Sequence, residues 1–181
     1  MFSKYLSKFI LKLMGWKIDY NIPKYDKCIA MMAPHTSNWD FIIGRLFYSA
    51  IEIKPSFLIK KEIFVFPLNY ILRSLGGIPI NRSKSTNLVE KVIKMFEEKE
   101  HFVLTITPEG TRKKVTKWKR GFYFISKKAK VPIILGYLDY KNKIAGVYGE
   151  YTPTDDIDKD LEIIKSYYKN ANAKHPEKFY I

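Results

Sequence analysis

The stretch that decides the fold is Lys27-Cys28-Ile29-Ala30-Met31-Met32-Ala33-Pro34-His35-Thr36-Ser37-Asn38-Trp39-Asp40. Residues 27–33 are almost all apolar and predict a buried strand. Pro34 and the polar residues after it predict a loop, and the apolar residues within 40–51 predict a helix. A buried strand followed by a loop and a helix is typical of an α/β fold, in which ligands meet the loops at the carboxyl ends of the strands.

The rest of the chain alternates between strand-like and helix-like stretches. The clearest helix is expected over residues 86–99, where apolar side chains recur at helical spacing. Strands are expected over 56–59, 78–80, 102–107, 131–139 and 143–151, and further helices within 62–75 and over 121–130 and 155–171. This alternation predicts an α/β protein with a mixed, mostly parallel sheet flanked by helices.

The N-terminal residues form a pattern of their own. Apolar side chains recur at helical spacing beside a basic flank: Phe2, Tyr5, Leu6, Phe9, Ile10 and Leu13, with Lys4, Lys8 and Lys12. This pattern is typical of a helix in a membrane interface, and it also fits a helix docked on the core. We therefore expect two parts, an amphipathic membrane-interface helix within residues 1–20 and a single domain over residues 21–181.

Composition and charge limit the classes of protein to which this chain can belong. Of the 181 residues, 46% are apolar and 28% charged, a globular balance that needs neither disulfides nor a metal to fold. Cys28 is the one cysteine, which favours a reducing compartment. The net charge of +14 indicates a polyanionic partner, either nucleic acid, an anionic membrane or a phosphorylated substrate. Residues 111–130 carry nine of the lysines and arginines and no acid.

No apolar stretch approaches the roughly 18–20 residues that a membrane span requires. Lysines interrupt any apolar signal-peptide core near the N-terminus, so the protein is expected in the cytoplasm. His35, His101 and His175 are scattered, without the spacing of metal ligands, and no metal is expected.

The first candidate site lies in the loop of the opening stretch, where four residues separate His35 from Asp40. An aspartate one helical turn beyond a histidine can accept the ring Nδ1–H, which leaves Nε2 free as a general base. The alternatives are a structural histidine with Asp40 as a first-turn helix residue, and Ser37 as a nucleophile beside the histidine.

The second candidate site is Pro108-Glu109-Gly110-Thr111-Arg112, directly after the strand expected over 102–107. Gly110 permits an unusual backbone angle or the close approach of a ligand. Thr111 and the loop amides can donate to an anion, and Arg112 can grip a phosphate with two hydrogen bonds. The alternative is a tight turn with an exposed arginine.

Together, and in this order, the two motifs closely resemble those of the glycerolipid acyltransferase family, which includes the 1-acylglycerol-3-phosphate acyltransferases. Three further stretches match the family's pattern: Lys60-Lys61-Glu62, Gly76-Gly77-Ile78-Pro79-Ile80-Asn81-Arg82 and Val131-Pro132-Ile133-Ile134. The resemblance spans about residues 27–140.

The resemblance implies that His35 is the general base and that Asp40 orients its ring. It implies that Glu109 orients Arg82 or Arg112, or bonds a hydroxyl. The side chains expected to bind substrate are Lys60, Arg82, Glu109, Gly110, Thr111 and Arg112. No cofactor is expected, because acyl-CoA or acyl-carrier protein is the co-substrate.

The function implied is transfer of a fatty acyl group to the hydroxyl of a lysophospholipid, above all 1-acylglycerol-3-phosphate, in phospholipid biosynthesis. Such an enzyme would be peripheral, on the cytoplasmic face of an anionic membrane. Another lyso-lipid acceptor, such as a lyso-amino-acid lipid, remains open, as do a His-dependent hydrolase and a non-catalytic basic lipid- or nucleic-acid-binding protein. No nucleic acid partner is expected, because the chain has no zinc spacing, recognition-helix pattern or aromatic RNA motif.

Overall fold

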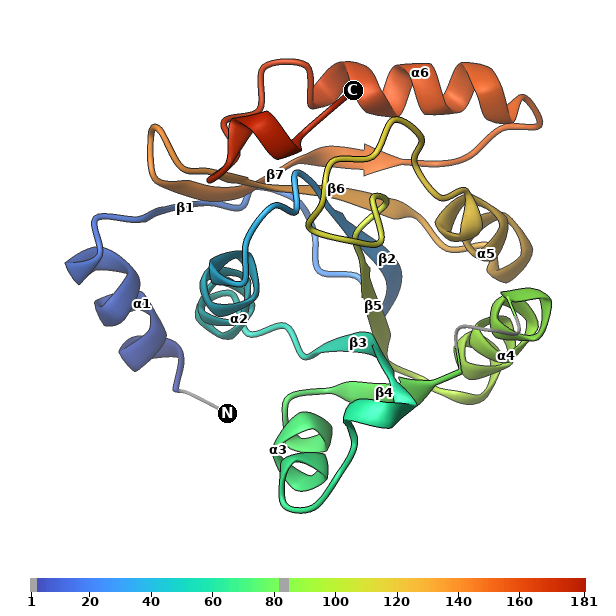
Figure 1. The fold of residues 1–181 in the computed structure, drawn as a ribbon, viewed down its shortest axis with the longest axis horizontal. Coiled ribbons are helices and arrows are strands. Elements are labelled where there is room, and N and C mark those ends of the chain that lie inside the picture. The colour runs from blue at the N-terminus through green and yellow to red at the C-terminus, as the bar shows by residue number, and fades with distance from the viewer. Residues whose placement is uncertain (1–2, 82–84) are drawn as a thin grey trace.

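The computed structural model describes residues 3–81 and 85–181 (Figure 1). Within these residues a seven-stranded sheet has the order β1-β7-β6-β2-β5-β3-β4. Its strands are β1 (Lys17–Asp19), β2 (Lys27–Met32), β3 (Pro55–Lys60), β4 (Gly77–Ile80), β5 (Phe102–Ile106), β6 (Ile133–Asp139) and β7 (Ile144–Tyr151). The helices are α1 (Lys4–Leu13), α2 (Trp39–Ala50), α3 (Leu68–Ser74), α4 (Ser85–Glu98), α5 (Gly121–Ala129) and α6 (Ile157–Tyr167), with short 3-10 helices η1 (Lys61–Ile63) and η2 (Pro176–Lys178).

The sheet is mixed and mostly parallel, as the alternation of elements predicts. From β6 through β2, β5 and β3 to β4 every neighbouring pair is parallel. Strand β7 runs antiparallel to β6, and β1 lies parallel to β7. Because β2 and β5 are parallel neighbours, with Met31 opposite Ile106, the loops that follow them leave the same edge of the sheet side by side.

The sheet has a hydrophobic core on each face. Along β2, Ile29 and Met31 pack in the core that α4, α5 and α6 cover. Cys28 and Ala30 point the other way, into the core that α1 and α2 cover (Figure 1). A strand buried on both faces reads as a continuous apolar run, which is why residues 27–33 predict it so clearly.

One expectation about the elements needs correction, and another gains detail. Residues 17–19 form the edge strand β1, so the sheet begins inside the 1–20 segment, which carries α1 and β1 rather than a helix alone. The helical region expected within 62–75 is confirmed as α3, although an irregular stretch interrupts the chain between η1 and the start of α3 at Leu68. Pro67 explains the interruption, because proline lacks a backbone N–H and disfavours the helical conformation of the residue before it.

Helix α1 docks on the domain by a narrow strip of its surface. Ser7 and Leu11 are buried against the core beside α2, while Tyr5, Phe9 and Leu13 are exposed. The apolar stripe seen in the sequence thus faces mostly away from the protein. No helix among the described residues combines the length and the apolar character that a bilayer crossing demands.

Candidate active site

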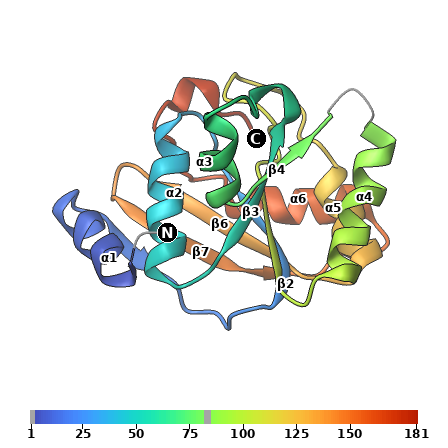
Figure 2. The ribbon, with the colours of Figure 1, turned by 90° about the horizontal axis from the view of Figure 1, so that it is seen from below.

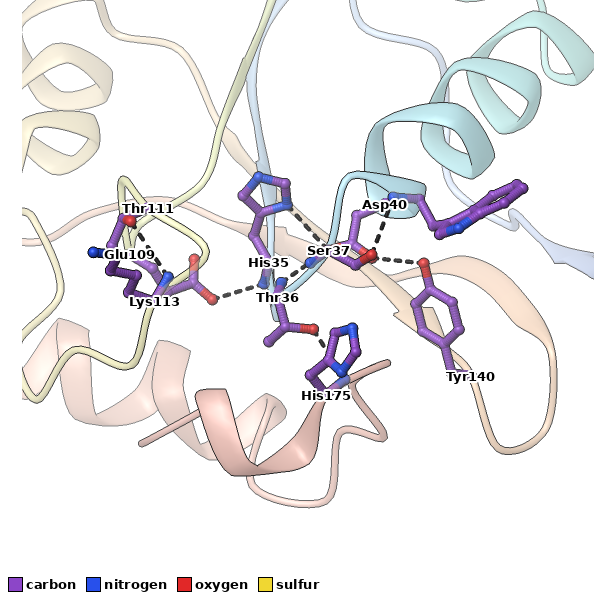
Figure 3. Close-up of polar contacts among 10 residues, drawn as sticks. His35, Thr36, Ser37, Asp40, Glu109, Thr111, Lys113, Tyr140 and His175 are labelled. Atoms are coloured by element: carbon purple, nitrogen blue, oxygen red, sulfur yellow. Dashed lines mark hydrogen bonds and ion pairs between the residues drawn. The ribbon is translucent and has the colours of Figure 1, made fainter.

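His35 lies in the loop that leaves the carboxyl end of β2, and Asp40 stands in the first turn of α2. Nδ1 of His35 is 3.1 Å from Oδ2 of Asp40, the contact predicted from their spacing (Figure 3). The His35 side chain is 19% exposed and that of Asp40 only 6%. None of the described residues hydrogen-bonds Nε2, so this nitrogen is open to a ligand.

The carboxylate of Asp40 is fixed by three further donors. Oδ2 accepts the backbone N–H groups of Thr36 at 2.8 Å and Ser37 at 2.9 Å, so the loop wraps around it. Oδ1 accepts the hydroxyl of Tyr140 at 2.6 Å, from the residue that follows β6. Because β6 is a parallel neighbour of β2, its carboxyl end reaches the same edge, which brings Tyr140 to Asp40.

These contacts keep Asp40 ionised. Burial raises the pKa of its carboxyl group, but the hydrogen bonds from His35, Tyr140 and the Ser37 N–H together outweigh burial, and the pKa lies below its usual value. Burial and the hydrogen bond to Asp40 raise the pKa of Tyr140, which therefore stays a donor. An ionised carboxylate on Nδ1 favours the tautomer with the proton there, and Nε2 then carries the lone pair of a base.

Glu109, in the loop after β5, holds His35 from the other side. Its Oε1 accepts the backbone N–H of His35 at 2.9 Å, and the residue is 5% exposed. Oε2 is also buried and has no hydrogen-bond partner among the described residues. Burial raises the pKa of this carboxyl group. No ion pair joins Glu109 to Arg112, which is exposed, and Arg82, the other arginine that it is expected to orient, lies outside the described residues.

The rest of this loop is shaped by Gly110. Its φ is +65°, in the left-handed region that favours glycine, and the nearest neighbour of a β-carbon there would be the flexible end of the Lys119 side chain. The Thr111 hydroxyl accepts the backbone N–H of Lys113 at 3.3 Å. Arg112 is exposed on the loop surface.

The other expected substrate-binding residues come from the next strands of the sheet. Lys60 is exposed at the carboxyl end of β3, which pairs with β5 and β4. Arg82 lies outside the described residues. The structure thus brings His35, Asp40 and Glu109 into direct contact, and it places Lys60 at the same edge of the sheet as the 108–112 loop.

Two contacts to the site come from residues that the motifs do not include. Tyr140 binds Asp40, and the backbone N–H of His175 donates to the Thr36 hydroxyl at 3.2 Å. The position of Tyr140 directly after the carboxyl end of an expected strand is the one local signal that could have marked it. His175 has no such signal, since it reaches the loop from just before η2 near the C-terminus.

We expect Tyr140→Phe to reduce activity only a few-fold and to destabilise the protein. A hydrogen bond to a charged group contributes roughly 1.5–3 kcal/mol to the free energy of unfolding. Since this bond lowers the pKa of Asp40, its contribution is present at neutral pH and lost as the pH falls through the pKa of the folded state. Denaturant unfolding of both proteins at neutral and acidic pH checks this, and a difference that grows in acid would contradict it.

A histidine base and a buried carboxylate in a loop at the carboxyl edge of an α/β sheet define a site that can deprotonate a hydroxyl group. A model of the Acyltransferase family matches residues 17–135, which include both motifs. The chain belongs to the acyltransferase family, and the resemblance drawn from its motifs is confirmed.

The fold has a known relative. It is similar to the crystal structure of the 1-acyl-sn-glycerophosphate (LPA) acyltransferase PlsC from Thermotoga maritima, with a TM-score of 0.63 and 17% identity. The match covers 94% of this chain and 80% of that one. A comparison with curated proteins found no significant match.

Proposed function

We propose that the protein transfers a fatty acyl group from acyl-CoA or acyl-carrier protein to the hydroxyl of a lysophospholipid, with 1-acylglycerol-3-phosphate as the favoured acceptor, in phospholipid biosynthesis. The observation that carries the proposal is the His35–Asp40 pair, whose Nε2 is open, in a chain of the acyltransferase family. The likeness in fold to PlsC, a 1-acyl-sn-glycerophosphate acyltransferase, supports the choice of acceptor.

The proposed reaction uses His35 as base and then as acid. Nε2 takes the proton of the acceptor hydroxyl, and the oxygen attacks the thioester carbonyl carbon of the donor. Asp40, fixed by its hydrogen bonds, offsets the positive charge that forms on the imidazole. When the tetrahedral intermediate collapses, the carbon–sulfur bond breaks and the thiolate takes the proton back from Nε2.

The surroundings of Ser37 and Cys28, the two side chains that could act as nucleophiles, support a direct transfer without an acyl-enzyme. Ser37 is buried, and its hydroxyl accepts the backbone N–H of Trp39 at 3.2 Å. Cys28 is buried within β2, and burial raises the pKa of its thiol to about 12. Neither side chain hydrogen-bonds the His35 ring, whose Nδ1 is paired with Asp40, so neither is set up for activation by it.

We assign the acceptor's phosphate to Lys60 and Arg112, at the carboxyl edge of the sheet, and to Arg82, which lies outside the described residues. The exposed position of Arg112 beside the loop that holds His35 supports this, since a guanidinium can bind phosphate with two hydrogen bonds. Thr111 and Gly110 line the same turn.

We expect Arg112→Ala to raise the KM for a phosphorylated acceptor roughly 10-fold or more while changing kcat little, because it removes binding shared by substrate and transition state. The effect should shrink for an acceptor without phosphate. Arg120→Ala is the matched control, because its guanidinium pairs with Asp158 at 2.6 Å. Equal losses with both acceptors in steady-state kinetics would assign Arg112 a structural role.

The membrane is the proposed partner of α1. Its exposed Tyr5, Phe9 and Leu13, with Lys8 and Lys12 also exposed, support an interfacial helix on the cytoplasmic face of an anionic membrane. Each basic residue near an anionic surface contributes about 1 kcal/mol. The protein would then be peripheral and would meet its lipid acceptor at the bilayer surface.

The experiment that tests the function is a donor-by-acceptor matrix with purified protein in mixed micelles, read by lipid mass spectrometry. Acyl-CoA and acyl-carrier protein are the donors, and the acceptors are 1-acylglycerol-3-phosphate, other lysophospholipids and a lyso-amino-acid lipid. We expect the highest rate with 1-acylglycerol-3-phosphate. A clear preference for the lyso-amino-acid lipid would replace that acceptor, and no acylated product in any cell would refute the proposal.

A further inference from the structure

The segment from η1 through α3 exposes a set of large apolar side chains that the site does not use. Its exposed members are Ile63, Val65, Phe66, Leu68, Tyr70 and Ile71, and Phe66 is 82% exposed. Helix α3 contributes no buried residue to either core. Contiguous exposed apolar surface is uncommon on a soluble domain and marks an interaction site.

Contacts with β4 and within the segment nevertheless fix its position. A β-carbon at Gly77 would lie 2.6 Å from the backbone oxygen of Leu72, so the missing side chain lets α3 approach β4 closely. The ring of Phe66 makes an edge contact with that of Tyr70, with centroids 6.3 Å apart. The apolar side chains are therefore presented by an ordered element rather than by a loose loop.

The segment lies at the same edge of the sheet as the site and on the same face of the sheet as α1. It follows β3, whose carboxyl end lies at the same edge as that of β2, which leads to His35. In Figure 1, α3 stands out from the body of the molecule on the side of the sheet that α1 and α2 cover. In Figure 2, α1, α2 and α3 all face the viewer, with α2 between the other two.

Helix α2 continues the apolar surface across this face. Trp39, Phe41 and Ile42 in its first turns are exposed, directly beside Asp40 in sequence. The exposed apolar side chains of α1 and of residues 63–71 thus flank the helix that carries Asp40.

The charges around the segment favour a lipid surface as its occupant. Residues 60–74 hold Lys60, Lys61 and Arg73 against a single acid, Glu62, and all four are exposed. The Arg73 guanidinium lies over the ring of Phe64, 5.6 Å from its centroid. Apolar and aromatic side chains with a basic rim are suited to an interface of anionic headgroups and acyl chains.

We propose that residues 61–74 are a second membrane contact, which inserts Val65, Phe66 and Ile71 into an anionic bilayer beside α1. The role of this contact rests on the proposed function, because it holds the carboxyl edge of the sheet at the surface from which a lipid acceptor arrives. If α1 were the single membrane contact, the domain could tilt relative to the bilayer. Two contacts on one face fix its orientation and strengthen binding without a new partner.

Site-specific fluorescent probes test the insertion without depending on activity. Cys28 is the one cysteine and is buried, so a cysteine introduced at an exposed position can be labelled selectively. We would label Phe66→Cys, Phe9→Cys and, as control, Ile163→Cys, which replaces an exposed residue of α6 on the far side of the sheet. The vesicles contain phosphatidylglycerol and phosphatidylcholine with brominated acyl chains.

We expect strong quenching of the probes at positions 66 and 9 and none at position 163. Quenching at position 9 without quenching at position 66 would overturn the second contact. Quenching at position 66 in a protein without acyl transfer would keep the contact and refute the proposed function, so the two failures are distinguishable.

Vesicle sedimentation provides an independent measurement. The double variant Phe66→Glu with Ile71→Glu should lower the partition coefficient at least about 10-fold, whereas Ile163→Glu should leave it unchanged. Circular dichroism checks the fold, and Phe66→Ser is the milder replacement if the double variant does not fold. If light scattering shows a dimer that Phe66→Ser dissociates, and the probe at position 66 is not quenched, the occupant is a second copy of the chain and the lipid proposal is wrong.

Discussion

His35→Ala is expected to lower the rate of acyl transfer by roughly 10²–10⁴, the range that a positioned general base contributes. The loss should appear in kcat, because Nε2 acts on the hydroxyl proton as the bond to the thioester carbon forms. Binding of donor and acceptor should change little, since alanine at this position leaves the basic edge of the sheet in place. Initial rates at saturating substrate measure the effect, and thermal unfolding shows that the variant is folded.

A second histidine provides the matched control. Nδ1 of His101 lies 2.8 Å from Oδ1 of Asp26, a contact much like that of the site, but both side chains are exposed. His101 precedes β5 and Asp26 precedes β2, so this pair lies at the opposite edge of the sheet. His101→Ala should leave the rate unchanged. Near-full activity of His35→Ala, or an equal loss in His101→Ala, would show that His35 is not the base.

The second large effect is expected for Asp40→Asn, which should lower kcat by roughly 10² or more. The amide oxygen can still accept from Thr36, Ser37 and the His35 ring, and the amide NH2 can turn toward the Tyr140 oxygen. The local geometry and the tautomer can therefore persist. What the variant removes is the negative charge that stabilises the imidazolium.

A comparison of kcat with KM separates this loss from a structural one. With asparagine in place of the ionised carboxylate, the imidazolium loses the charge that stabilises it, so kcat should fall while the KM values for donor and acceptor stay near those of the wild type. Asp26→Asn is the control and should leave the rate unchanged. Asp40→Asn with wild-type kcat would contradict the role assigned to the carboxylate.

Much of the fold is predictable from the sequence, and the exceptions have physical reasons. Strand β2 is buried on both faces, so an apolar run identifies it without any knowledge of its neighbours. Strand β1 has only three residues and becomes a strand through pairing with β7, where Lys17 lies opposite Ile144. No local pattern can show a pairing so distant in sequence. A helical region within 62–75 is predictable, but its start at Leu68, directly after Pro67, is seen only in the structure.

The residues of the site also differ in how far the sequence alone predicts their contacts. His35 and Asp40 are predictable as a pair because one loop brings them together within a helical turn. Glu109 is found by its motif, yet its contact with the backbone of His35 depends on the parallel pairing of β2 with β5. Tyr140 reaches Asp40 across 100 residues of sequence, and only the position of β6 in the sheet brings them together.

The apolar surface of residues 63–71 shows a further limit of sequence patterns. The same side chains fit a helix packed on the core or a helix facing a membrane, because periodicity records a face and not what covers it. In α1 the two possibilities coexist, with Leu11 buried while Phe9 is exposed. In α3 the structure shows that the apolar side chains are exposed, which the sequence pattern alone does not reveal.

The most direct test of the central claim is the product balance of one reaction. Purified protein is mixed with acyl-CoA and 1-acylglycerol-3-phosphate in micelles, and mass spectrometry quantifies diacyl lipid, free fatty acid and free thiol. The account predicts that the wild type forms one diacyl lipid for each thiol released, and that His35→Ala forms almost none. Free fatty acid in place of diacyl lipid would identify a hydrolase, and equal diacyl lipid from both proteins would show that His35 does not perform the chemistry.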